Sequence, residues 1–118
     1  METREAIFNF QYSEKMKSGL IIGTNLLDQL GSLKNEELSG GKKVLVWYLE
    51  GLLREIRIAE TVLGLGHYTD LERKVMELIG RIHMSQFQEA QWSFSEAISL
   101  ATTSCQAAMI FLMEKKLV

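Results

Sequence analysis

Apolar residues recur every three or four positions through the first thirty residues of the chain, the spacing of one face of an α-helix. Charged residues such as Glu14, Lys15 and Asp28 fall on the other side of this pattern. The buried positions expected from it are Tyr12, Met16, Leu20, Gly23, Leu27 and Leu30, widened by Ile22, Leu26 and Leu33. The pattern therefore predicts an amphipathic helix from about residue 3 to residue 30.

A second stripe of the same kind follows the segment Ser39-Gly40-Gly41, where Ser39 is the residue type that caps a helix N-terminus. Its positions are Leu45, Leu49, Leu52, Ile56, Ala59 and Leu63, with Trp47, Leu53 and Val62 broadening the buried arc. We expect this helix to end at Gly64 in a left-handed conformation, with Leu65 packing back against the last turn.

The remaining apolar positions fall into two stripes whose phases differ. Thr69 and Glu72 have the spacing of a capping box and precede Leu71, Val75, Leu78 and Ile82. The second stripe contains Phe87, Ala90, Phe94, Ala97, Ala101, Ser104, Ala108 and Phe111. Either a second capping box, Ser85 to Gln88, starts a fourth helix, or one helix of roughly 70 Å continues through a stutter and pairs with a partner chain.

We favour a break at residues 83 to 86, because a compact bundle requires one. The sequence then predicts one all-α domain over residues 1–118, an up-and-down bundle of four helices. Three helices, the last one long and paired in a dimer, are the alternative. The chain contains no proline, so nothing forbids long helices.

Composition adds that the chain is a single domain with an apolar core of its own. It has 118 residues, of which 47% are hydrophobic and 24% charged. Its single cysteine, Cys105, excludes an internal disulfide, and the N-terminus has no secretory pattern, so we expect a cytoplasmic protein. The uncharged run at residues 97–113 is interrupted by hydroxyl and amide side chains, so we expect no membrane span.

Patterns typical of catalysis, cofactors or metals are missing from the sequence. Gly64 and Gly80 stand three residues before His67 and His83, so the Glu-x-x-His pairs of metal-binding bundles do not occur. Cys105 lies among alanines and methionine, without the basic neighbours that activate a thiol. We therefore expect no metal and no cofactor, and we favour a noncatalytic protein.

Three weaker signals remain. A polar and aromatic cluster at the third helix junction is the first choice for a ligand pocket: His83, Gln86, Gln91 and Trp92. Lys42 and Lys43 follow two glycines and could hold an anion at a helix N-terminus. Glycines and alanines on the first and last stripes, with one phenylalanine among them, allow helices to approach closely. They could serve either packing within the chain or an interface between copies: Gly19, Gly23, Phe94, Ala97, Ala101 and Ala108.

The leading functional interpretation is a bundle that acts through protein contacts, as a homodimer or as a small subunit of an assembly. Its basis is that apolar residues such as Phe8, Phe10, Trp47 and Trp92 exceed what three stripes need, and aromatic residues are enriched at interfaces. The alternative from another class is a small-ligand-binding bundle, or an enzyme of unrecognised type, with its site near His83. A third reading, weak nucleic-acid binding through Lys42, Lys43, Arg54 and Arg57, is disfavoured by the net charge of −2.

Overall fold

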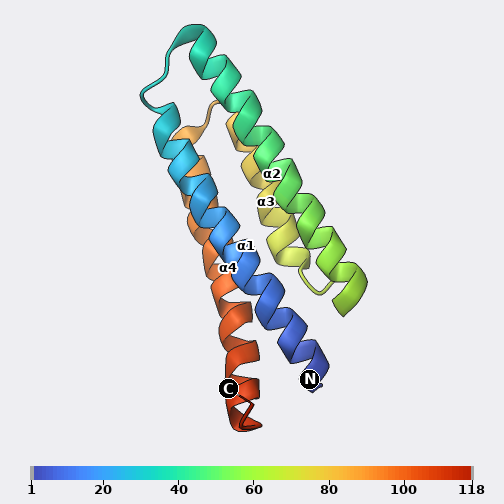
Figure 1. Ribbon diagram of the computed structural model, residues 1–118. Coiled ribbons are helices and arrows are strands. Elements are labelled where there is room, and N and C mark those ends of the chain that lie inside the picture. Colours follow the sequence, from blue (N-terminus) through green and yellow to red (C-terminus); the bar gives the residue numbers. More distant parts are fainter. Residues whose placement is uncertain (1, 118) are drawn as a thin grey trace.

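The computed structural model describes residues 2–117, and these residues form four α-helices joined by short turns (Figure 1). The helices are α1 (Thr3–Leu30), α2 (Asn35–Leu63), α3 (Thr69–His83) and α4 (Phe87–Glu114). Consecutive helices run antiparallel, which confirms the up-and-down four-helix bundle. The molecule is elongated, with extents of 54 × 22 × 17 Å.

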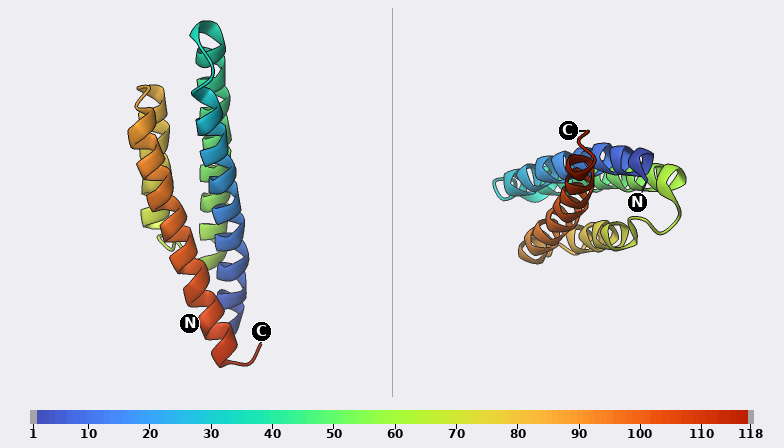
Figure 2. Two further views of the ribbon diagram at one scale, coloured as in Figure 1. Left: turned by 90° about the vertical axis from the view of Figure 1, so that its left-hand side faces the viewer. Right: turned by 90° about the horizontal axis from the view of Figure 1, so that it is seen from below.

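Each helix packs against two neighbours, so the four form a closed ring in section. α1 contacts α2 and α4, and α3 contacts the same two helices from the other side. The most extensive packing joins α1 to α4, the first helix to the last. α3 is about half as long as the others, so near the chain ends α1 and α4 continue past it, as Figure 2 shows.

The alternative of one long C-terminal helix is wrong, because the chain turns between His83 and Phe87. Ser85 adopts a left-handed conformation with φ of 59°, and the Gln86 amide donates a 2.8 Å hydrogen bond back to the Arg81 carbonyl. This hydrogen bond and the left-handed Ser85 end α3 and turn the chain back, so that α4 runs antiparallel to α3. A polar turn without glycine or proline thus provides the break that the two phases required.

The core consists of the predicted stripes, one from each helix. The largest side chains that are almost completely buried are Phe94, Leu20, Leu45, Leu49, Ile56, Leu78 and Ile82. Alanines Ala90, Ala97, Ala101 and Ala108 supply much of the buried face of α4. Small side chains there let α4 lie close to α1, which explains the extensive packing between these two helices.

The expected start of α2 after Gly41 is wrong, because the helix begins at Asn35. Gly41 lies inside the helix, where an added Cβ would be 2.6 Å from Leu30 and 3.0 Å from Leu33. The glycine at position 41 therefore marks close packing against the end of α1. It does not mark a loop, although the composition of this segment is typical of one. Ser39 is consequently not an N-cap.

Both capping-box predictions are also wrong. α3 begins with Tyr68 at the cap position and without a side-chain cap bond, and the Thr69 hydroxyl donates to the Gly66 carbonyl instead. The Ser85 hydroxyl accepts a hydrogen bond from Lys42 and caps nothing. Gly64 has a positive φ of 120° but a ψ of 145°, so it does not adopt the expected left-handed helical conformation, and Leu65 is 93% exposed instead of packed on the last turn.

Four residues expected to widen the buried arcs point outward instead: Ile22, Leu26, Trp47 and Val62. A helix in a four-membered ring buries a narrow arc, because its two neighbours leave the far side open. These residues lie beyond that arc, so they form part of the surface.

Within residues 2–117, α4 is long and apolar enough to cross a bilayer by length and composition. The core helix of a water-exposed bundle passes the same test, and the alanine stripe of α4 is packed here against α1 and α3.

Candidate functional site

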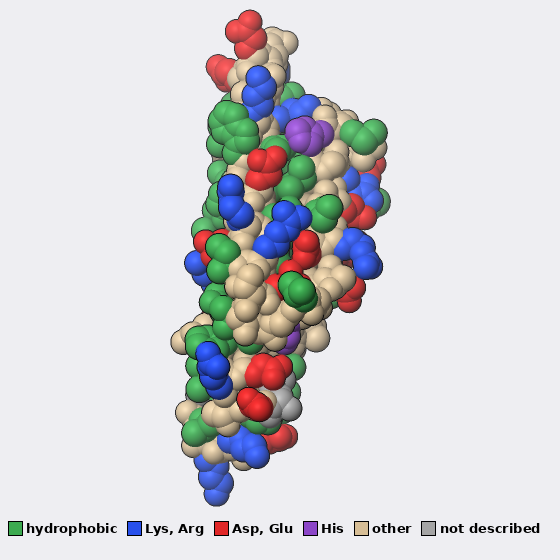
Figure 3. Space-filling view, turned by 90° about the vertical axis from the view of Figure 1, so that its right-hand side faces the viewer, with side chains coloured by type: hydrophobic (Ala, Val, Ile, Leu, Met, Phe, Trp, Pro, Cys, Tyr) green, Lys and Arg blue, Asp and Glu red, His purple; other side chains and the backbone are tan. Residues whose placement is uncertain are grey.

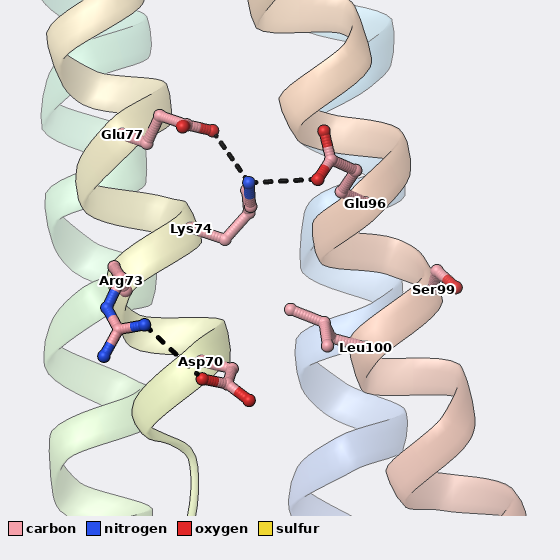
Figure 4. Close-up of a pocket in the computed structure, with 7 residues that line it drawn as sticks. All are labelled: Asp70, Arg73, Lys74, Glu77, Glu96, Ser99 and Leu100. Carbon is pink, nitrogen blue, oxygen red and sulfur yellow. Dashed lines mark hydrogen bonds and ion pairs between the residues drawn. The ribbon is translucent and has the colours of Figure 1, made fainter.

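A charged groove of about 460 Å³ lies between α3 and α4 (Figure 4). At its centre the Lys74 ammonium is 3.0 Å from Glu77 on its own helix and 3.0 Å from Glu96 on the facing helix. Arg73 lies 3.7 Å from Asp70 along the rim. Three acids, Asp70, Glu77 and Glu96, line the groove with two bases, Arg73 and Lys74, so the lining carries one excess negative charge.

Glu77 is the most constrained member of this groove. It accepts a 2.7 Å hydrogen bond from the Ser93 hydroxyl on α4. This bond, together with Lys74, lowers the pKa of Glu77 below its usual range. Hydrogen bonds to Glu77 and Glu96 in turn raise the pKa of Lys74. The groove is thus a polar cross-link between α3 and α4, with its main donors and acceptors already engaged.

A buried polar network joins α1, α4 and the start of α3. The Tyr68 hydroxyl donates to Asn9 Oδ1 at 2.6 Å, and the Ser104 hydroxyl donates to the same oxygen at 2.8 Å. The Ser13 hydroxyl lies 3.0 Å from both Asn9 Oδ1 and Ser104 Oγ. Burial raises the pKa of Tyr68, so its phenol stays protonated as a donor. Each hydroxyl has partners, which makes the network a connector between three elements.

The loop that carries Tyr68 is held by a buried carboxyl group. Glu60 on α2 accepts hydrogen bonds from the amides of Gly66 at 3.1 Å and Tyr68 at 3.3 Å. Burial raises the pKa of Glu60, while hydrogen bonds from Glu60 and Arg57 lower the pKa of the neighbouring Glu72. These groups position the loop and are occupied in doing so.

The four residues of the predicted ligand pocket do not come together. Trp92 is 61% exposed, and Gln91 bonds to Asp28 on α1 across the α1–α4 seam. Gln86 is half-buried in the turn, and His83 alone lines a cavity. The dispersal follows from the turn at residues 84–86, which points successive side chains in different directions.

That cavity, of about 290 Å³, lies between His83 and the two predicted anion-binding lysines. Lys42 donates to Ser85 Oγ at 2.7 Å and thereby ties α2 to the α3–α4 turn. Because α2 begins at Asn35, Lys42 and Lys43 lie two turns inside the helix. The helix N-terminus expected beside them is not there, which removes the physical basis of the anion site.

Six residues were expected to serve either packing within the chain or an interface between copies, and all six are buried within the bundle. An added Cβ would come within 2.6 Å of Leu52 at Gly19 and within 2.7 Å of Phe94 at Gly23. The other four are completely buried: Phe94, Ala97, Ala101 and Ala108. They serve intramolecular packing, and any contact between copies must use other residues.

The surface that sequence reasoning missed is the solvent-facing side of α2, which we call the α2 outer face. Its members recur at helical spacing: Gly40, Val44, Trp47, Gly51, Ile58 and Val62. The four large side chains are 57%, 64%, 51% and 44% exposed, in chain order. Figure 3 shows the side of the molecule where α2 lies, with hydrophobic side chains recurring along its length among separate charged groups. Part of the signal is in the sequence, where Trp47 is one of the surplus aromatic residues, but the apolar stripe assigns both Trp47 and Val62 to the buried arc.

A second apolar feature is a groove of about 620 Å³ between α1 and α4. Phe10, Met109 and Ile110 line it, and the Cys105 thiol donates to Glu14 at 3.0 Å on its floor. Burial, and then the adjacent carboxylate, raise the pKa of Cys105 to about 11. The thiol is therefore unreactive at neutral pH.

Among residues 2–117, no group of three or more His, Cys, Asp or Glu side chains is arranged to hold a metal ion. Of the four cations considered for nucleic-acid binding, Arg57 is paired with Glu72 and Lys42 is bonded to the α3–α4 turn. No protein family model, curated protein or solved structure matches the chain.

Proposed function

We propose that this chain acts through protein–protein contact, as a noncatalytic bundle whose binding surface is the α2 outer face. The observation that carries the proposal is the row of four large apolar side chains, Val44, Trp47, Ile58 and Val62, left exposed on one helix. At their exposed fractions they present roughly 400 Å² of apolar surface, as much as the largest patch on a typical monomer, and such patches are often functional.

Two glycines on the same face support this proposal. Within the part of the chain that the structure describes, nothing lies within 4 Å of a Cβ added at Gly40 or Gly51. A glycine inside a helix costs about 1 kcal/mol relative to alanine, and packing within this chain offers no reason for either. A partner that approaches the backbone of α2 closely gives both positions a use.

Site-specific photocross-linking tests the proposal. A photoreactive phenylalanine analogue replaces Trp47 in one variant and Trp92 in another, and both proteins are irradiated in the cells that produce the chain. Trp92 is the matched control because it is an exposed tryptophan, 61% against 64%, on a different helix. We expect protein adducts from position 47 and few from position 92, since interface cores are enriched in tryptophan.

Adducts of equal yield at both positions would contradict the proposal, as would none at position 47. A second variant guards against a local artefact. Ile58→Glu places a charge on the same outer face, so it should reduce the adduct at position 47 while the thermal unfolding temperature stays unchanged. An undiminished adduct would place the contact elsewhere.

A ligand-binding role has one specific observation in its favour, the apolar groove between α1 and α4. Its walls include Phe10 and Met109, and its volume of about 620 Å³ suits a small molecule. A ligand that binds there should raise the unfolding temperature by mass action, and Met109→Glu should remove the shift. A shift that survives this change would exclude the groove.

A further inference from the structure

We infer that the partner of the α2 outer face is a second copy of this chain, bound with the two α2 helices antiparallel around a twofold axis between Leu52 and Leu53. The inference rests on the proposed function and names its partner. Its basis is that Trp47 meets Ile58, and Gly51 meets Arg54, about that one point, with charges of opposite sign beside them.

The complementarity in size follows from the order of residues along α2. Seen from the point between Leu52 and Leu53, Trp47 and Ile58 are equally distant on opposite sides, and so are Val44 and Thr61. In an antiparallel pair Trp47 of one copy therefore meets Ile58 of the second copy, and Val44 meets Thr61. Each of these contacts occurs twice, once on either side of the twofold axis. The exposed fractions of 64% for Trp47 and 51% for Ile58 show that both side chains have surface left to bury.

The central layer pairs the smallest residue with a large one. The innermost equidistant pair is Gly51, on this face, and Arg54, which is exposed beside it. The open space above Gly51 accommodates the Arg54 side chain of the second copy, whose methylene stem can lie on the exposed backbone. This arrangement gives a use to a glycine at a position where an alanine would stabilise the helix.

The charges beside this layer have the same symmetry. Glu50 lies on one flank of the face. In the antiparallel arrangement it is about 1.5 Å along the axis from Arg54 of the second copy on the same flank, with Arg57 next to it, whereas Glu55 of the second copy is level with it on the opposite flank. Two equivalent ion pairs thus form next to the axis. They compensate the two arginines that the axis brings together.

A parallel arrangement lacks these features. It would set Arg54 against Arg54 and place Glu50 beside Glu55 of the other chain, so like charges would meet at the centre and on the flanks. It would also leave Gly51 opposite Gly51, with no side chain to fill the gap. The charge pattern therefore selects the antiparallel orientation.

The buried area agrees with a dimer of modest affinity. With about 400 Å² of apolar surface per copy and the flanking polar residues, the interface buries on the order of 1,000 Å² in total. That value is at the small end of specific interfaces. We expect dimers to form between about 1 and 100 µM.

Cysteine pairs test the arrangement directly. Val44→Cys and Thr61→Cys are each made in a Cys105→Ala background, where an alanine continues the alanine stripe of α4. In the antiparallel dimer position 44 meets position 61, while like positions are about 25 Å apart along the axis. A short bis-maleimide should therefore link the two variants when they are mixed and link neither alone.

Links within each variant alone would indicate the parallel arrangement and overturn the inference. Light scattering that shows a monomer at about 1 mM would overturn it as well. In that case a photoadduct of position 47 with a different protein would keep the proposed function, so the two failures are distinguishable. A dimer that persists unchanged in Trp47→Ala would also overturn it, because that change should raise Kd by about 30-fold, whereas Trp92→Ala should not.

Charge reversal supplies a further check that does not depend on cross-linking. Glu50→Arg and Arg54→Glu should each raise the dimer Kd by about tenfold, since each creates like charges across the axis. The double variant exchanges the two charges and should restore the Kd. A double variant as weak as the sum of the singles would show that these residues do not meet.

Discussion

Gly23→Ala tests how closely α1 and α4 approach one another. The added Cβ would lie 2.7 Å from Phe94 Cε1 and 3.0 Å from Cζ, inside the distances that real Cβ atoms keep. The Phe94 ring is 0% exposed, so it has no free space into which it can turn. Overpacking of this kind costs about 1–3 kcal/mol, against about 1 kcal/mol gained in helix propensity. With a clash this close, we expect a net loss of about 1–2 kcal/mol.

Gly80→Ala is the matched control, because within residues 2–117 nothing lies within 4 Å of an added Cβ at this helical glycine. It should gain about 0.5–1 kcal/mol from helix propensity alone. Urea unfolding followed by circular dichroism measures both changes, and thermal melting should show a fall of about 5 °C for the Gly23 variant. The close packing of α1 on α4 would be refuted if Gly23→Ala were as stable as Gly80→Ala.

Three further outcomes follow from the side-chain contacts. Tyr68→Phe removes a buried hydroxyl from the polar network and should lower the free energy of unfolding in urea by about 1–2 kcal/mol; an unchanged value would show that the network contributes no net stability. Ser93 and then Lys74 lower the pKa of Glu77 in the folded state. The stabilising contribution of Glu77 is therefore complete above its unfolded pKa and is lost as pH falls through the lowered native pKa. Glu77→Gln should flatten that part of a profile of stability against pH, and an unaltered profile would contradict the assignment. With its pKa raised to about 11, Cys105 should react with iodoacetamide at pH 8 much more slowly in the folded protein than in urea, as followed by mass spectrometry; equal rates would show that the thiol is accessible and unperturbed.

Helical periodicity was sufficient for the fold because each helix buries one continuous stripe. Residues such as Leu20, Leu49 and Leu78 recur at the spacing that places them inside, and the change of phase after Ile82 located the last turn. Termini were harder to predict. The segment containing Gly41 has loop-like composition, but its small residues lie beside Leu30, a tertiary contact that local composition does not reveal.

The polar network and the α2 outer face were missed for opposite reasons. Asn9 and Ser13 continue the spacing of Met16 and Leu20, so they lie in register with the core although they are polar. Their position predicted burial, but their chemistry argued against it, and only Tyr68 and Ser104 explain how burial is satisfied. Trp47 is the reverse case, because its apolar character predicted burial while its position on α2 places it outside.

The extensive packing of α1 on α4 has a consequence for the order of folding. Synthesis completes α1 before α2, α3 and α4, and hydrogen bonds between Asn9 and Ser104 join residues 95 positions apart. A nascent chain therefore carries α1 with its apolar stripe only partly covered until α4 leaves the ribosome. The bundle then closes in one late step, which makes α1 the segment most in need of protection from aggregation during synthesis.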